Sequence, residues 1–353
     1  MIRIFGLFFV LSSVSAFANI EIDLRGRGGP MEGIGQTAQG YHPTDLCGFF
    51  TFSNYLDSHR ISRGFERGAE MTRSNPVSIG VEYAIRKNLP YWFPLQNTTD
   101  PLSVRMGRAG SLFCTLAEAV RESGYCADES LPSQTVDETA KFSDLTTYFY
   151  AELQEIAEAL PARRIEFLNI KIGGLYAAYF NWASERKNIL FDQNEIRELI
   201  AKQIDKPYLT IRSLFLSKCN DQTRRKSDFD FGSCRSEFFV KNERTRADRA
   251  ARKISELLEA PRAMPVPIAY CGVVLKEGKA YGTRKRPVGA DCGLHWSLVV
   301  GRRQIGEDRY LLVHNSWRPN ANYSKDWILD EGDIWVREKE LTRATVLVQW
   351  LEE

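Results

Sequence analysis

The sequence contains a cysteine, a histidine and an asparagine that together could carry out thiol chemistry: Cys47, His295 and Asn315. A cysteine attacks as its thiolate, and a thiol with a pKa of about 8.5 is mostly protonated at neutral pH, so it needs a helix N-terminus or an imidazole beside it. Apolar residues follow Cys47 at helical spacing, which predicts that Cys47 lies in the first turn of a helix. His295 begins one β-like run and Asn315 follows another, so two strands could hold them rigidly.

The other histidines are weaker candidates for the base. The four histidines are His42, His59, His295 and His314. The first lies in the loop before Cys47 and the second far along the same predicted helix, and we expect both at the surface. If the two runs pair as a hairpin, then Asn315 and Trp317 arrive beside His295.

The first residues have the layout of a cleavable secretory signal. Residues 1–18 hold a basic Arg3, an apolar run from Ile4 to Val14 and the small-residue ending Ala16-Phe17-Ala18. This run is shorter than the ~20 residues that span a bilayer, and no later segment is long and uncharged enough to span one. We therefore expect an exported protein, periplasmic or extracellular, without a membrane span.

The cysteine count independently selects Cys47. The seven cysteines are Cys47, Cys114, Cys126, Cys219, Cys234, Cys271 and Cys292. In an oxidising compartment thiols tend to pair, so an odd number leaves one over. Joining sequence neighbours predicts three disulfides, Cys114–Cys126, Cys219–Cys234 and Cys271–Cys292, although proximity is the only ground for this choice. The cysteine left over is Cys47.

The spacing of apolar residues changes from helical to β-like along the chain, which predicts an α+β fold. Residues 19–133 are mainly helical, residues 134–261 form a largely helical insertion with polar breaks, and residues 262–353 carry short β-branched and aromatic runs split by Gly, Asp and Pro. The expected helices are 47–60, 77–87, 111–122, 143–159, 193–204 and 246–259. The expected strands are 266–274, 296–301, 310–313, 333–336 and 345–350. A helical lobe and an antiparallel β lobe would leave a cleft between them.

The overall charge balance bears on the kind of partner that the protein could bind. With 47 basic and 45 acidic side chains, the balance gives no reason to expect a nucleic acid or an anionic membrane as partner. The basic run 224–226 is expected to be a solvated loop. Histidines and cysteines lie at no metal-ligand spacing, so no metal or other cofactor is predicted.

Several of these segments resemble the papain-like cysteine peptidase family (peptidase C1-type). The matching segments are Asp23-Leu-Arg25, His295 with Trp-Ser-Leu-Val-Val-Gly after it, Asn315-Ser316-Trp317 and Gly332-Asp-Ile-Trp-Val336. The resemblance covers about 19–133 and 262–350. It implies a two-lobe fold with Cys47 as nucleophile, His295 as base and later acid, Asn315 as the group that orients the histidine, and Trp317 as a shield over their hydrogen bond.

The resemblance is weaker around the nucleophile. The family's oxyanion glutamine lies six residues before the cysteine, where this chain has Tyr41. Gln36 and Gln39 compete for that role, Gln36 being preferred because it follows Ile34-Gly35. Gly110 is the candidate for binding substrate backbone, although a loop before a helix would explain it equally well. Gly48 replaces the family's usual tryptophan, and no inhibitory pro-segment is expected.

The sequence thus predicts a cysteine endopeptidase that hydrolyses peptide bonds in a peptide or protein substrate through a Cys47 thioester. Two alternatives are a catalytically silent papain-fold binding module and a cysteine amidase acting on cell-wall peptides. The natural substrate and the oligomeric state are open at this point.

Overall fold

The computed structural model describes only part of the chain. Its described residues are 21–34, 47–64, 74, 76–86, 112–126, 136–159, 165–185, 191–204, 206–216, 232–239, 245–277, 294–317 and 322–352. The predicted signal segment, residues 1–18, lies outside them.

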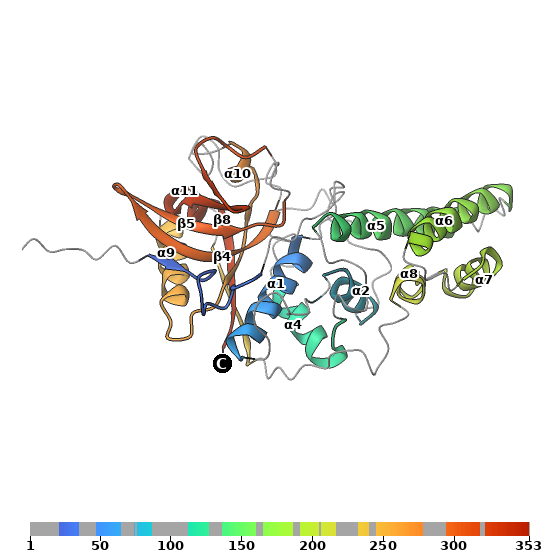
Figure 1. Ribbon diagram of the computed structural model, residues 1–353, viewed down its shortest axis with the longest axis horizontal. Coiled ribbons are helices and arrows are strands. Elements are labelled where there is room, and N and C mark those ends of the chain that lie inside the picture. The colour runs from blue at the N-terminus through green and yellow to red at the C-terminus, as the bar shows by residue number, and fades with distance from the viewer. Residues whose placement is uncertain are drawn as a thin grey trace, which may run out of the picture.

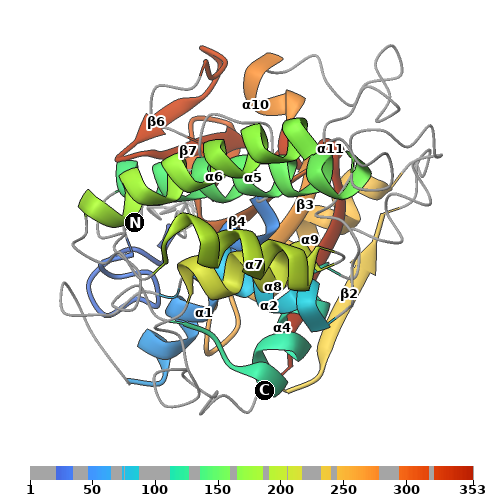
Figure 2. The ribbon, with the colours of Figure 1, turned by 90° about the vertical axis from the view of Figure 1, so that its right-hand side faces the viewer.

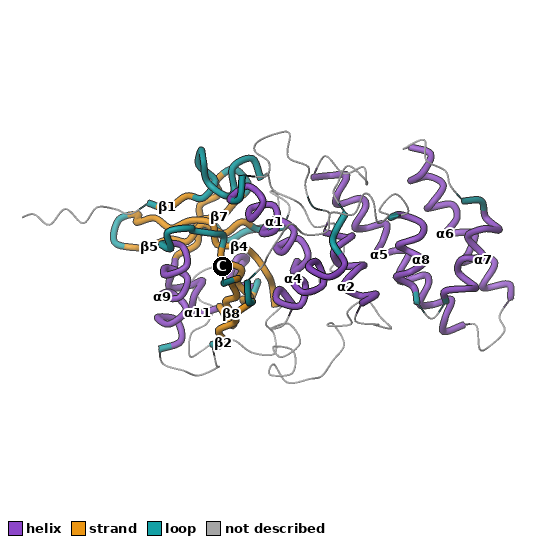
Figure 3. Tube along the Cα trace, turned by 90° about the horizontal axis from the view of Figure 1, so that it is seen from below, coloured by secondary structure: helices purple, strands orange, loops and turns teal. Residues whose placement is uncertain are grey.

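Helices and an antiparallel sheet make up a mixed α+β fold (Figure 1). The helices are α1 (Cys47–Ser62), α2 (Pro76–Arg86), α4 (Leu112–Ser123), α5 (Val136–Ala159), α6 (Ile165–Glu185), α7 (Gln193–Gln203), α8 (Pro207–Phe215), α9 (Arg246–Leu258), α10 (Val273–Glu277) and α11 (Glu338–Ala344). The strands are β1 (Ile22–Asp23), β2 (Cys234–Phe238), β3 (Val266–Cys271), β4 (Leu294–Ile305), β5 (Asp308–His314), β6 (Ile328–Asp330), β7 (Asp333–Arg337) and β8 (Thr345–Leu351). The sheet occupies one end of the molecule, α5 to α8 the other, and α1, α2 and α4 lie between them (Figures 1 and 3).

The strands of the described residues pair in the order β2-β8-β3-β4-β5-β7-β6, with β1 added beside β4. β1 comes close to β4 at Gly301, where a Cβ atom would lie 2.6 Å from the carbonyl oxygen of Ile22. A bulge between Val299 and Gly301 interrupts the pairing of β4 with β5 at the same point. The absence of a side chain at Gly301 therefore lets the N-terminal strand join the sheet.

The predicted hairpin is confirmed by the pairing of β4 with β5. Ile305 faces Asp308, so the connecting loop is two residues long, and Gly306 in that loop has a positive φ of 61°. Short hairpin loops favour glycine because their backbone twist requires positive φ. The other end of this hairpin carries His295 and leads into Asn315.

Helix α1 is buried along nearly its whole length, from Cys47 to Ile61. It packs against β4 on one side and against α2 and α4 on the other. Phe113 of α4 makes edge-on contacts with Phe52 and Tyr55. Because the helix is enclosed on all sides, its polar side chains are buried together with its apolar ones.

Helices α5 to α8 have a hydrophobic core of their own, which Val81 of α2 and Cys126 join. Figure 2, viewed from that end of the molecule, shows α5 and α6 above α7 and α8. Helix α7 begins with a capping box in which the Asp192 carboxylate accepts from the N–H of Glu195. These four helices make up most of the segment predicted to be an insertion.

Two elements of that segment belong to the sheet instead. β2 pairs with β8 over Cys234 to Phe238, and α9 packs against α11 and β8. β2 and α9 thus precede residue 261 in sequence but pack into the same core as the strands that follow it. The domain boundary predicted at residue 261 stays a prediction.

The predicted helices are confirmed as α1, α2, α4, α5, α7 and α9, with ends within two residues of the prediction, except that α5 begins seven residues earlier, at Val136. α6 and α8 were not predicted. The strand predicted over 266–274 ends at Cys271, and the short helix α10 follows. Within the described ranges, none of the helices combines the length and apolar character that crossing a bilayer requires.

Candidate active site

A hydrogen bond joins His295 and Asn315 inside the protein. His295 lies at the start of β4 and is 5% exposed, and Asn315 follows the last residue of β5 and is fully buried. His295 Nε2 lies 2.6 Å from Asn315 Oδ1. Because that oxygen can only accept, Nε2 carries the hydrogen and Nδ1 bears the lone pair of a neutral ring. The β4–β5 hairpin therefore presents a histidine in one defined tautomer.

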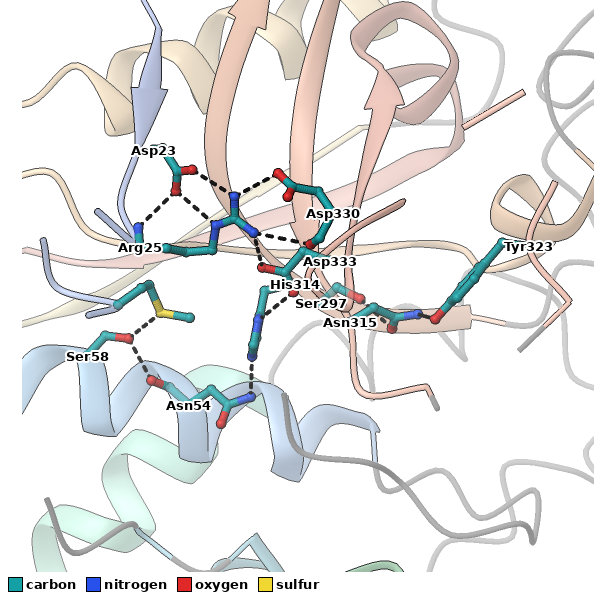
Figure 4. Close-up of polar contacts among 11 residues, drawn as sticks. Asp23, Arg25, Asn54, Ser58, Ser297, His314, Asn315, Tyr323, Asp330 and Asp333 are labelled. Carbon is teal, nitrogen blue, oxygen red and sulfur yellow. Dashed lines mark hydrogen bonds and ion pairs between the residues drawn. The ribbon is translucent and has the colours of Figure 1, made fainter. Parts of the chain in front are cut away.

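Two hydroxyl groups contact the amide of Asn315 (Figure 4), and a third contacts one of them. Ser297 Oγ donates to Oδ1 at 3.2 Å, and Nδ2 donates to Tyr323 OH at 3.2 Å. Tyr270 OH lies 3.0 Å from Ser297 Oγ and acts as the donor, because the only hydroxyl hydrogen of Ser297 goes to Asn315. This arrangement determines which end of the amide faces His295.

Aromatic rings cover the histidine. Trp317 lies on His295 with 4.6 Å between ring centroids, and Tyr323 stacks on Trp317 at 6.0 Å. Tyr270 meets His295 edge-on at 5.6 Å. The ammonium of Lys276 lies 5.1 Å above the Trp317 ring. These rings exclude water from the His295–Asn315 bond, which strengthens it.

Burial also sets the acid–base state of His295. Loss of hydration lowers the pKa of His295 to about 4; the hydrogen bond to Asn315 opposes this shift, and the positive charge of Lys276 adds to it. Burial likewise raises the pKa of Tyr323 to about 12, against the effect of its hydrogen bond from Asn315. The imidazole is therefore neutral, and Tyr323 protonated, at neutral pH.

Cys47 is the first residue of α1, as predicted, and is 6% exposed. It retains its thiol, and its place in the first turn favours the thiolate, because helix N-termini stabilise negative charge. Burial raises the pKa of Tyr270, and the charge of Cys47 adds to that shift. Cys47 thus lies within electrostatic range of Tyr270, whose ring contacts His295.

The disulfide pattern corrects the prediction from sequence neighbours. Cys114 of α4 is bonded to Cys234 of β2, 120 residues away. The predicted pairs Cys114–Cys126 and Cys219–Cys234 are therefore wrong. The physical reason is that α4 packs against β2, while Cys126 is buried in the other hydrophobic core, that of α5 to α8. Spacing in sequence carries no information on this packing.

Cys126 and Cys271 are also disulfide-bonded. The predicted bond from Cys271 to Cys292 stays a prediction, because Cys292 lies outside the described residues. The oxyanion candidates Gln36 and Gln39, and the substrate-binding candidate Gly110, also lie outside them.

A cavity of about 410 Å³ lies at the opposite end of α1 from Cys47, and its lining includes Tyr55, His59 and Trp350. None of the residues of the His295 cluster lines it. The expectation that His59 is at the surface is wrong, since it is 4% exposed. The cause is the burial of α1 on all sides.

Sequence reasoning missed Tyr270, Ser297 and Tyr323. Tyr270 faces His295 across the β3–β4 pairing, and Ser297 lies two residues after His295 on the same face of β4, so period-two alternation could have found Ser297. Tyr323 lies eight residues after Asn315, outside the strands, and no periodic signal marks it.

No family model matches the chain, and no curated protein matches its sequence. Among solved structures, the chain is similar to a digestive procathepsin L2 proteinase from Tenebrio molitor larval midgut, with a TM-score of 0.41 and 10% sequence identity. The match covers 94% of this chain and 68% of that chain. At this level of similarity the match assigns neither an activity nor residue roles.

Proposed function

We propose that this chain is a papain-like cysteine endopeptidase in which Cys47 is the nucleophile, His295 the general base and acid, and Asn315 the residue that orients the imidazole. One observation carries the proposal: the buried bond of 2.6 Å between His295 Nε2 and Asn315 Oδ1. That bond leaves Nδ1 as the only ring nitrogen that can accept a proton from a thiol. A Cys-His pair with a third orienting group is the usual signature of an activated thiol.

The acylation step begins with a neutral pair, because the low pKa of His295 disfavours a resting imidazolium. The proton of Cys47 Sγ moves to His295 Nδ1 as sulfur attacks the carbonyl carbon of the scissile peptide bond. A tetrahedral oxyanion results. When it collapses, the bond between carbon and nitrogen breaks, Nδ1 returns the proton to the leaving amine, and a thioester on Cys47 remains.

Deacylation reverses the roles of the same groups. A water molecule gives a proton to His295 Nδ1 and adds to the thioester carbonyl. Breaking the bond between carbon and sulfur releases the carboxylic acid, and the proton returns to Cys47. Throughout both steps Asn315 holds Nε2, and Trp317 covers their bond.

The oxyanion would be stabilised by the backbone N–H of Cys47 and by the side chain of Gln36, with Gln39 as the alternative. The N–H of Cys47 belongs to the first turn of α1, where backbone donors have no partner within the helix. Gly110 would bind the substrate backbone. These assignments rest on the sequence resemblance.

An exported location suits this proposal. The Cys114–Cys234 disulfide is compatible with an oxidising compartment, and the signal layout of residues 1–18 supports export. The substrate would be an extended peptide or an unfolded segment of a protein, because cleavage inside a chain needs access to a bare peptide bond.

The test combines labelling with turnover. The mature chain is treated with an epoxysuccinyl thiol reagent and, separately, with a library of internally quenched peptides, alongside Cys47→Ala and Asn315→Ala. We expect stoichiometric label on Cys47, slower labelling of Asn315→Ala, and peptide cleavage that Cys47→Ala abolishes. A wild-type protein as inactive as Cys47→Ala on every peptide would refute the peptidase.

The same measurements separate the two alternatives. Labelling of Cys47 without cleavage of any peptide or of purified peptidoglycan would favour a catalytically silent binding module. Cleavage of peptidoglycan, with casein and the library left intact, would favour a cell-wall amidase.

A further inference from the structure

A second buried polar chain runs beside the candidate catalytic site (Figure 4). Asn54 Nδ2 lies 3.0 Å from His314 Nε2, and His314 Nδ1 lies 2.8 Å from Asp333 Oδ1. Asp333 Oδ2 in turn lies 3.5 Å from a guanidinium nitrogen of Arg25, which also pairs with Asp330 at 2.9 Å. The three residues at the centre, Asn54, His314 and Asp333, are each less than 5% exposed.

The partners determine the state of His314. A carboxylate can only accept, so Asp333 receives the hydrogen of Nδ1, and Nε2 accepts from the amide of Asn54. Both ring nitrogens are then occupied within the protein. His314 therefore has no nitrogen left to exchange protons with a substrate, although it is next to Asn315 in sequence.

Three members of this polar chain lie on, or next to, elements that carry or pair with the candidate catalytic residues. Asn54 is seven residues after Cys47 on α1, which is two helical turns, about 10 Å, along the same face. His314 is the last residue of β5 and immediately precedes Asn315. Arg25 follows β1, which pairs with β4, the strand that begins with His295.

This connectivity matters because α1 and the β4–β5 hairpin are separate elements. Apolar packing between them is not directional, whereas a hydrogen bond needs a donor–acceptor distance of about 2.7–3.2 Å and a nearly linear angle. Each partner is buried, so a slide would leave a donor or acceptor unsatisfied, at a cost of about 1–3 kcal/mol. The polar chain thus favours one position of α1 relative to Asn315.

On the basis of the proposed function, we infer that Asn54, His314 and Asp333 are positioning residues that hold the Cys47 thiol at working distance from the His295–Asn315 pair. They act through α1 and β5 and touch no reacting atom. A displacement of about 1 Å between reacting groups costs up to roughly a hundredfold in rate. Loss of the chain should therefore lower kcat and leave KM nearly unchanged.

The experiment compares His314→Leu with His314→Gln and with Phe52→Leu. Glutamine can still donate to Asp333 and accept from Asn54, whereas leucine can do neither. Phe52→Leu weakens the apolar packing of the same helix against Phe113 and leaves the polar chain intact. Thermal stability, kcat, KM and the rate of Cys47 alkylation by a small neutral haloacetamide are measured for each.

We expect His314→Leu to lose roughly tenfold to a hundredfold in kcat and to slow the alkylation of Cys47, with His314→Gln recovering most of both. Phe52→Leu should lower the melting temperature and keep kcat. Equal kcat and alkylation rates in His314→Leu and Phe52→Leu would overturn the inference, as would a glutamine variant no better than leucine.

Two provisions keep the outcome decisive. If His314→Leu does not fold, Asn54→Leu, which is close in size to asparagine, removes the same link from the other side and is compared with Asn54→His. If the wild-type protein cleaves no peptide, the proposed function fails, yet the alkylation rate of Cys47 still reports whether His314 controls its environment.

Discussion

His295 meets Asn315 through Nε2, at 2.6 Å from the amide oxygen, so its Nδ1 is directed to the other side of the ring. The two nitrogens of an imidazole have different roles once one of them is bound. The orientation of a single amide therefore decides which nitrogen can serve a thiol, and Ser297 and Tyr323 decide the orientation of that amide.

Replacing Asn315 by alanine should lower kcat, by roughly tenfold to a hundredfold, with little change in KM, because the ring can then rotate and adopt the other tautomer. Steady-state kinetics on the best library peptide measure this. Asn315→Gln is the matched control, since it keeps an amide but displaces it by one methylene. An unchanged kcat in Asn315→Ala would contradict the orienting role.

The fall of kcat/KM at acidic pH should reflect protonation of His295. Because the pKa of His295 is lowered to about 4, the base form persists into mildly acidic solution, and kcat/KM should fall only as the pH approaches that value. Lys276→Met removes a positive charge that lowers this pKa, so the acid limb should move toward higher pH. Lys276→Arg keeps the charge and should leave the limb in place.

The shift of the acid limb in Lys276→Met should become smaller at high salt, because Lys276 is exposed and salt screens its charge. Rate profiles at two ionic strengths check it. If the acid limb of the kcat/KM profile moves toward lower pH in Lys276→Met, the lysine does not act on His295 through its charge.

Stability should fall in acid for the same reason. The pKa of His295 is about 4 in the folded protein and 6.5 in its model state. Below pH 6.5 His295 binds a proton in the unfolded chain but not in the folded chain. The free energy of unfolding therefore falls as the pH drops from 6.5 toward 4. The loss attributable to this group reaches about 3 kcal/mol. Urea unfolding of wild type and His295→Gln at pH 7 and pH 4 measures it; an equal loss in both would exclude His295 as the cause.

The disulfide map makes a chemical prediction. Cys114–Cys234 is formed, Cys126 and Cys271 are disulfide-bonded, and Cys47 retains its thiol. If the predicted Cys271–Cys292 bond is present, Cys126 is left with Cys219. Alkylation of the native protein followed by peptide mapping without reductant should recover label on Cys47 and a Cys126–Cys219 crosslink. A crosslink between Cys126 and Cys292 would contradict this.

The parts of the fold that sequence predicted are those governed by local rules. A helix that begins at Cys47 follows from the apolar spacing after it, and the hairpin that brings Asn315 to His295 follows from two β-branched runs with a glycine between them. Both signals arise within a short stretch of the chain, where periodicity is informative.

The parts that sequence missed depend on contacts between distant segments. The pairing of Cys114 with Cys234 requires α4 to pack against β2. β2 itself was not predicted, because it lies within a segment whose apolar spacing is mostly helical. Asn54 and Asp333 meet His314 from opposite ends of the chain, and no spacing rule joins them. His59 appeared exposed because a histidine on a helix usually is.

The Cys114–Cys234 bond has a consequence for proteolytic processing. It closes a covalent loop that contains α5 to α8, with Cys47 before the loop and His295 and Asn315 after it. A protease that cut anywhere inside this loop would yield a two-chain form whose halves stay linked, each contributing part of the candidate triad. Such a nicked species would migrate as one band without reductant and as two bands after reduction, and trimming within the loop would leave the nucleophile joined to its base.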